Sequence, residues 1–186
     1  WEALKLSSIF TFQKGSEPGS SEYLNKKETP DHVKFYRVGD IEGNTSTYVD
    51  SKSKKYKYAS KRDVIVTFDG SVGKIGFCLN GAFSGGLRKI FDKNGIFDNS
   101  LIYFIFKDES IIATIHKYAT GSILLHASGA IDNLIIPFNK SIYLKFQKII
   151  KPIYDMMIKN KTENQQLSSL RDWLLPMLMN GQAKAV

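Results

Sequence analysis

Residues 163–181 read ENQQLSSLRDWLLPMLMNG, a helical pattern that ends at proline, asparagine and glycine. It carries more apolar surface than a solvated tail needs. Upstream, no glycine occurs back to Lys140, and apolar residues recur at alternating steps of three and four. This spacing keeps one face of a helix against a partner helix. The expected pairing positions are Phe146, Ile149, Ile153, Met156, Asn160, Leu167, Leu170 and Leu174.

The predicted helix spans residues 140–180, with about 35 helical residues and a length of about 50 Å. Ser141 is suited to cap its start, and Pro152 should kink it or break it locally. A compact domain of this size does not cover so long a helix, which favours a projecting helix paired as a coiled coil. Two alternatives stay open: the helix folds back on its own domain, or two shorter helices hinge at Pro152. Asn160 in the stripe favours pairing, because a buried asparagine can fix register.

Residues 1–139 are rich in β-branched and aromatic residues, and turn signals interrupt them at short intervals. This composition and the spacing of the turns predict a mostly β domain with one or two packed helices, one of them within residues 99–121. The fold class expected for the whole chain is α+β, with a domain at 1–139 and the long helix at 140–180. Strands are expected at residues 33–38, 63–68, 74–79, 87–91, 122–127 and 133–138.

The 186 residues suffice for one core plus an appendage. A net charge of +8 and a pI near 9.4 favour a polyanionic partner, either nucleic acid or an anionic membrane surface. No leader peptide is visible at Trp1, and the apolar run at 101–106 is too short to cross a bilayer. The single cysteine, Cys78, suits a reducing cytoplasm, the expected location.

Catalytic and metal sites have little support. The three histidines have no close histidine partner, and no paired cysteines exist. Residues 70–76, GSVGKIG, lack two residues of a phosphate loop and predict a tight turn between strands. One nuclease-like set remains as an alternative: Asp31, Asp50 and Lys52, which could bring two carboxylates and a lysine to a phosphodiester. A protein-interaction adaptor without DNA contact is the other alternative.

Contact with DNA is the chemistry that the residues favour. The run SKSKKYKYASKR at 51–62 interleaves lysines with tyrosines and suits phosphates, although a solvated loop would read the same way. Short polar side chains and arginines in the glycine-rich loops could reach base edges. The candidate DNA-binding residues are Lys14, Ser16, Arg37, Lys54, Lys55, Lys57, Ser71, Lys74, Ser84 and Arg88.

These segments together resemble the specificity subunit of type I restriction-modification enzymes. The resemblance rests on WEALKLSSIFTFQKG at 1–15, VKFYRVGDI at 33–41, RDVIVTFDGSVGKIG at 62–76, TGSILLHAS at 120–128 and the closing segment at 163–181. It covers nearly the whole chain, as one target recognition domain followed by one conserved long helix. We therefore expect either the C-terminal half of a full subunit or a half-subunit that pairs with itself.

The resemblance implies a non-catalytic subunit that reads double-stranded DNA and directs methylation and restriction by partner subunits to a bipartite site. Its expected partners are methyltransferase subunits, a motor and nuclease subunit, and a second specificity half or a second copy. S-adenosylmethionine, ATP and Mg²⁺ would then be bound by the partner subunits, and none by this chain. Membrane association is not expected.

Overall fold

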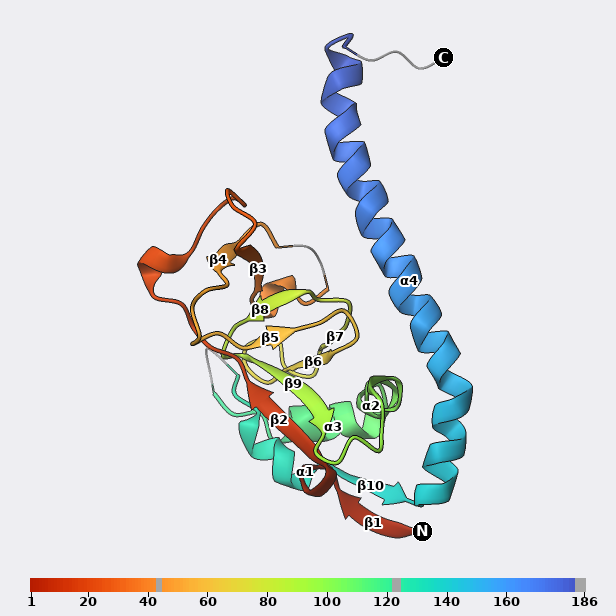
Figure 1. Ribbon diagram of the computed structural model, residues 1–186. Helices are drawn as coiled ribbons and strands as arrows, with labels where there is room; N and C mark the ends of the chain where they lie inside the picture. Colours follow the sequence, from red (N-terminus) through yellow and green to blue (C-terminus); the bar gives the residue numbers. More distant parts are fainter. Residues whose placement is uncertain (43–44, 122–124, 183–186) are drawn as a thin grey trace.

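The computed structural model describes residues 1–42, 45–121 and 125–182. Ten strands form a body beside which one long helix rises (Figure 1). The strands are β1 (Glu2–Lys5), β2 (Phe10–Lys14), β3 (His32–Tyr36), β4 (Tyr48–Asp50), β5 (Tyr58–Ala59), β6 (Val64–Thr67), β7 (Ile75–Gly76), β8 (Gly81–Phe83), β9 (Leu87–Asp92) and β10 (Ile135–Phe138). The α-helices are α1 (Leu6–Ile9), α2 (Asn99–Phe106), α3 (Glu109–Lys117) and α4 (Lys140–Met179), with 3-10 turns η1 (Ser20–Glu22), η2 (Val38–Asp40) and η3 (Ser128–Asn133). The part of the chain from β1 to β10, with the short helices between these strands, is called the body.

The strands form three small sheets. The central sheet has the order β2-β9-β6-β7 and is antiparallel throughout. A second sheet, β4-β3-β8-β5, contains the parallel pair β3 and β8. The third pairs β1 with β10 beside the start of α4, so the first strand of the chain lies next to the base of the long helix (Figure 1).

The main apolar core lies between the central sheet and the helices. Every residue of β6 is buried, which explains why its sequence VIVT is continuously non-charged instead of alternating. Phe12 packs edge-on against Phe68 and against Phe106 of α2, with ring centroids 6.0 and 5.9 Å apart. The mixed α+β class with a long C-terminal helix is therefore confirmed.

Several local predictions need correction. The helical pattern at 99–121 forms two helices, because the Asp108 side chain accepts the Ser110 amide at 2.9 Å and starts α3. A hydrogen bond from the Ser110 hydroxyl, together with the one from its amide, lowers the pKa of the Asp108 carboxyl. The strand expected at 74–79 is only β7, since Cys78 adopts φ 61° and leaves the strand conformation. Half of the strand expected at 122–127 falls outside the described residues, and residues 125–127 form only isolated bridges at His126.

α4 is one helix of 40 residues, about 60 Å long, drawn as a single gently curved rod in Figure 1. It continues through Pro152 and Pro176, so the break at Pro152 and the two-helix alternative are wrong. Its cap is Asn139, whose side-chain oxygen accepts the Ile142 amide at 3.2 Å; Ser141 is already inside the helix.

The first half of α4 packs on the body, and the second half extends past it. Ile150 and Tyr154 are buried in the main core, and the Tyr154 hydroxyl donates to the Arg62 carbonyl at 3.0 Å. Burial raises the pKa of that hydroxyl. Farther along, the Lys161 ammonium lies 4.5 Å from the Phe77 ring centroid. Both expected arrangements therefore occur in the same helix: its first half packs back on the body, and its second half projects.

We expect Tyr154→Ala to lower the free energy of unfolding by about 3–5 kcal/mol, because it opens a cavity where α4 meets the core. Tyr154→Phe, which removes only the hydrogen bond, should cost about 1 kcal/mol. Tyr118→Ala is the matched surface control, since Tyr118 is 38% exposed. Urea unfolding followed by circular dichroism measures all three. Equal losses at Tyr154 and Tyr118 would contradict the docking role.

Candidate nucleic-acid interface

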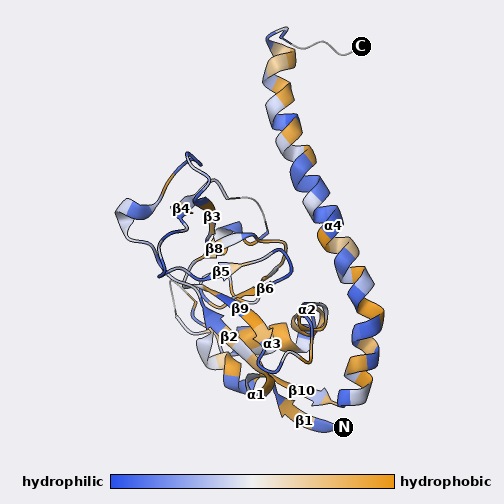
Figure 2. Cartoon of the chain, viewed as in Figure 1, coloured by the Kyte–Doolittle hydropathy of each residue, from blue (hydrophilic) through white to orange (hydrophobic). Residues whose placement is uncertain are grey.

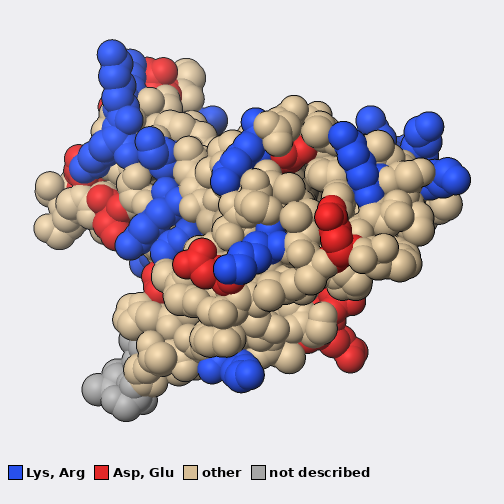
Figure 3. Space-filling model, turned by 90° about the horizontal axis from the view of Figure 1, so that it is seen from below, with Lys and Arg blue, Asp and Glu red and all other residues tan. Residues whose placement is uncertain are grey.

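A cleft of about 610 Å³ opens on the body where several loops converge. It brings together four of the predicted DNA-binding residues, which come from distant parts of the sequence: Lys14, Arg37, Ser71 and Ser84. Glycines at positions 39, 70, 85 and 86 keep the cleft open at the backbone level. Basic side chains are spread over the face of the molecule shown in Figure 3, with acidic ones between them.

Backbone hydrogen bonds hold the cleft loops together. The Phe68 and Asp69 amides donate to the Gly86 carbonyl at 3.0 and 3.3 Å, and the Ser84 amide donates to the Tyr36 carbonyl at 2.9 Å. At Gly15, a Cβ atom would lie 2.1 Å from the Ser84 carbonyl oxygen. Only glycine permits this approach of the loop after β2 to the loop before β9.

Arg88 lies beneath the cleft, with 4% of its surface exposed. Its guanidinium donates to the Gly85 carbonyl at 2.5 Å and to the Ser128 hydroxyl at 3.0 Å. Burial lowers the pKa of this guanidinium, as expected for a charge taken from water. The geometry gives Arg88 the position of a support for the cleft floor, out of direct reach of a ligand.

Arg37 and Lys14 are the basic groups that line the cleft itself. The Arg37 side chain is 57% exposed and donates to the Thr47 hydroxyl at 3.0 Å, with Asp40 at 3.7 Å. A carboxylate also lies in the cleft, because Glu17 accepts the Gly85 amide at 2.7 Å. The cleft therefore offers both donors and acceptors, which suits recognition of base edges better than binding of phosphate alone.

Sequence reasoning missed several cleft residues, among them Glu17, Asp69 and His126. His126 Nδ1 lies 2.7 Å from Asp69 Oδ1, and both side chains line the cleft. His126 thus has a hydrogen-bonding partner, but no local motif links residues 57 positions apart. A signal was absent because the pair depends on the pairing of the segment at residues 125–127 with the loop after β6.

The lysine run at 51–62 lies next to this region and is mixed in character. Lys54 and Lys57 are exposed, whereas Lys55 is paired with Glu22, a contact that raises the pKa of Lys55. Tyr56 is buried against Phe35, so it packs in the second sheet and is not free to stack on bases. The Ser16 hydroxyl donates to the Lys55 carbonyl at 2.8 Å, which joins the run to the loop after β2.

The turn at 70–76 forms as expected between β6 and β7, with Gly70 and Gly73 at positive φ. Ser71 lines the cleft, but Lys74 does not; its ammonium pairs with Glu42 at 2.9 Å. Of the two predicted DNA-contacting residues in this turn, Ser71 therefore faces the cleft and Lys74 lies on a different surface.

The nuclease-like set does come together, in a surface hairpin. Lys52 pairs with Asp31 at 2.7 Å, and its backbone amide donates to Asp50 at 2.9 Å. Among the described residues, no three histidine, cysteine, aspartate or glutamate side chains are grouped so that they could hold a metal ion. In the same residues, no helix combines the length and apolar character needed to cross a membrane.

Most of the predicted pairing stripe lies on the face of α4 that points away from the body, but Phe146 packs edge-on against Phe104 of α2, with ring centroids 6.5 Å apart. Met156 is two residues, about 160°, around the helix from buried Tyr154. Seven of the eight predicted positions are exposed, with Leu174 partly covered. Hydrophobic residues, coloured orange, recur along the projecting half of α4 in Figure 2.

We expect Arg88→Met to destabilise the chain by about 2–4 kcal/mol, since it leaves buried carbonyl acceptors without their charged donor. Lys54→Met, at an exposed position, should change stability by less than about 0.5 kcal/mol. Urea unfolding of both variants measures the difference. Similar stabilities would show that Arg88 does not hold the cleft floor.

Comparison with known proteins agrees with the resemblance seen in the sequence. No family model matches the chain. The chain is similar to the specificity subunit of the type I restriction enzyme HindI from Haemophilus influenzae, with 24% identity over 193 residues. The match covers 98% of the chain and 41% of that subunit, so the chain spans less than half the length of this relative.

Solved structures show the same fold. The S subunit of a type I restriction-modification system from M. genitalium aligns with a TM-score of 0.61 and 16% identity, over 92% of this chain and 42% of that one. An HsdS subunit from Thermoanaerobacter tengcongensis aligns with a TM-score of 0.56 and 16% identity, over 95% and 44%. The resemblance of this chain to type I restriction-modification specificity subunits is thus confirmed in both sequence and fold.

Proposed function

We propose that this chain recognises a DNA sequence as one half of a type I restriction-modification specificity unit. Residues 1–139 would form the recognition domain and residues 140–180 the assembly helix. The observation that carries this proposal is the cleft, which gathers Lys14, Arg37, Ser71 and Ser84 from separate loops on a specificity-subunit fold. Reading of a single half-site follows from a chain that matches about 41% of its relative.

The physical division of labour follows from the placement of the charges. Exposed lysines such as Lys54 and Lys57 would contact phosphates and set affinity without sequence preference. Arg37, held by Thr47 and Asp40, is oriented for hydrogen bonds in a groove. Arg88 would act indirectly, by holding the Gly85 carbonyl and the loop around it.

The partners follow from the same proposal. Methyltransferase subunits and a motor and nuclease subunit would supply the chemistry in the cytoplasm, with S-adenosylmethionine, ATP and Mg²⁺ bound to them. The chain itself would be non-catalytic. A similar structure that covers 95% of this chain concerns the complex assembly and conformational transition of the type I system, which supports a role in assembly.

DNA binding should weaken as salt rises, because each phosphate contact releases counterions. We expect the double variant Lys54→Gln/Lys57→Gln to reduce the slope of log affinity against log salt by about 1–2 on any duplex. Lys159→Gln, a charge-matched change on exposed α4, should leave the slope unchanged. Fluorescence anisotropy with duplex DNA provides the measurement. Absence of binding to duplex DNA at low salt would favour an adaptor without DNA contact.

Sequence recognition should appear as methylation of a defined motif. The chain, mixed with its methyltransferase subunits, S-adenosylmethionine and genomic DNA, should direct adenine methylation to one interrupted motif, mapped by single-molecule sequencing. Arg37→Ala should relax one base position by about 1–3 kcal/mol, whereas Lys54→Gln/Lys57→Gln should lower methylation evenly. Magnesium-dependent cleavage by the chain alone, lost in Asp31→Asn, would instead support the nuclease alternative.

A further inference from the structure

We propose that a lysine-lined hollow between the second sheet and α4 binds a phosphate group, at a site separate from the recognition cleft. The hollow has a volume of about 320 Å³. Its walls come from β3 and β4, from the loops before β6 and before β8, and from the projecting half of α4. The polar side chains that line it include Lys27, Lys34, Lys61, Tyr36, Asn80 and Gln165.

Strand pairing brings three of the lining residues to one face of the second sheet. Lys34 of β3 lies directly opposite Tyr48 of β4, and cross-strand partners share a face. Tyr36 follows Lys34 by two positions along β3, which places it on the same face. Phe35, between them, belongs to the opposite face, where it packs against Tyr56. The alternation of β3 therefore sets an ammonium beside two phenols at the hollow.

The charge around the hollow is of one sign. Three lysines line it, and none of the described residues that line it is acidic. In the part of the chain that the structure describes, neither Lys34 nor Lys61 pairs with a carboxylate, unlike Lys52, Lys55 and Lys74. Like charges gathered around one hollow repel each other, and a bound anion would offset that repulsion.

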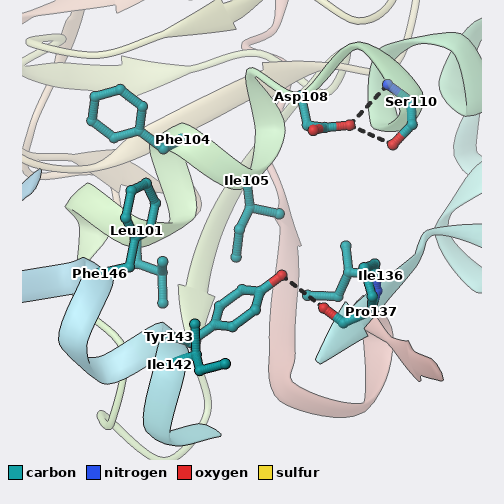
Figure 4. Close-up of a pocket in the computed structure, with 10 residues that line it drawn as sticks. All are labelled: Leu101, Phe104, Ile105, Asp108, Ser110, Ile136, Pro137, Ile142, Tyr143 and Phe146. Atoms are coloured by element: carbon teal, nitrogen blue, oxygen red, sulfur yellow. Dashed lines mark hydrogen bonds between the residues drawn. The ribbon is translucent and has the colours of Figure 1, made fainter. Parts of the chain in front are cut away.

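Two other hollows of the molecule have different chemistry. The recognition cleft holds Glu17 and Asp69 beside its basic groups. The groove at the base of α4, of about 470 Å³, is lined mainly by apolar and aromatic side chains such as Phe104 and Phe146, and its charged residue is Asp108 (Figure 4). Of these three hollows, as lined by described residues, the lysine-lined one alone presents positive charge without a carboxylate. It therefore favours an anion over a neutral or mixed ligand.

A phosphate group matches this set of side chains. Lysine ammoniums bind phosphate as point charges. The carboxamides of Asn80 and Gln165 can donate hydrogen bonds without adding charge. A phosphate presents several acceptor oxygens to donors that arrive from different sides. The volume of the hollow corresponds to about ten water molecules, which leaves room for one phosphate group and the waters that bridge it to the walls.

α4 closes one side of the hollow. Gln165 of α4 lines it, and the Cys78 thiol, also in its wall, lies 3.4 Å from the Thr162 hydroxyl of α4. This contact holds the helix against the body beside the hollow. A phosphate bound here would therefore contact the body and the projecting helix together.

The hollow adjoins the recognition cleft at the end of β3. Tyr36 lines the hollow, and the next residue, Arg37, lines the cleft. Arg37 donates to the Thr47 hydroxyl at 3.0 Å, and Thr47 precedes Tyr48 of the hollow. A DNA strand that leaves the cleft at this point carries its backbone phosphates toward the lysines. The inference thus names DNA backbone phosphate as the ligand and in this respect rests on the proposed function; a soluble phosphate compound is the other source of the same group.

Thermal unfolding in inorganic phosphate tests the site itself. At constant ionic strength, phosphate at about ten times its dissociation constant should raise the melting temperature of the unaltered chain by about 3–6 °C. Lys34→Gln/Lys61→Gln should lose this rise. Lys145→Gln/Lys148→Gln, which removes two exposed lysines from the first half of α4, should keep it. Excluded phosphate stabilises any folded protein, so the difference between the two double variants is the measured quantity.

An equal rise in both double variants would overturn the proposal. Lys34→Arg/Lys61→Arg keeps both charges and should keep the rise, which separates loss of charge from damage to the fold. If circular dichroism shows that Lys34→Gln/Lys61→Gln is unfolded, Lys61→Gln alone, at an exposed loop position, provides the same comparison.

Fluorescence anisotropy with duplex DNA identifies the source of the phosphate. If it is the DNA backbone, Lys34→Gln/Lys61→Gln should bind about tenfold more weakly than Lys145→Gln/Lys148→Gln at about 0.1 M salt, with a salt slope smaller by about 1. Equal DNA affinities, with the rise in inorganic phosphate still lost, would assign the site to a soluble phosphate compound. If the unaltered chain does not bind duplex DNA, the proposed function fails, and the measurement in inorganic phosphate still decides whether the site exists.

Discussion

The docking of the first half of α4 on the body determines how the rest of the chain can act. Ile150 and Tyr154 enter the core, and the Tyr154 hydroxyl satisfies the Arg62 carbonyl at 3.0 Å. Burial of these side chains contributes about 1.5–3 kcal/mol each. Because a helix is rigid over this length, fixing its first half also fixes the direction of the projecting half. The predicted pairing stripe beyond Phe146 is thereby held on the far side of the helix.

The cleft depends on a second buried constraint, the guanidinium of Arg88. Loops that carry Arg37, Ser71 and Ser84 are anchored by buried neighbours such as Val72 and Phe83, and backbone hydrogen bonds fix their course between these anchors. Arg88 joins the Gly85 carbonyl to Ser128 below the cleft, and Gly15 allows the loop after β2 to approach Ser84 closely. Rigid support of this kind leaves the surface side chains of the loops free to vary with the ligand that they contact.

The sequence predicts local periodicity well and long-range contact poorly. The long helix and β3, β6, β9 and β10 follow from spacing, composition and turn residues. The break before α3 depends on a single Asp108 cap, and the burial of Arg88 depends on a partner 40 residues away. The pair of His126 with Asp69 had no local signal. Basic residues next to glycines in the sequence identified part of the cleft. How deeply each basic side chain is buried could be seen only in the folded structure.

The two faces of α4 explain why its amphipathic pattern is hard to interpret from sequence. A helix with one buried face shows one stripe, but α4 has a short stripe at Ile150 and Tyr154 and a longer one from Phe146 to Leu174. The shorter stripe has the same step from Ile150 to Tyr154 and Met157 but ends there, whereas the longer one continues through the projecting half of the helix. Because apolar residues lie on two faces, each turn of α4 is also less polar than a turn of an ordinary surface helix. The helix therefore packs one face on its own body and leaves most of the other face exposed.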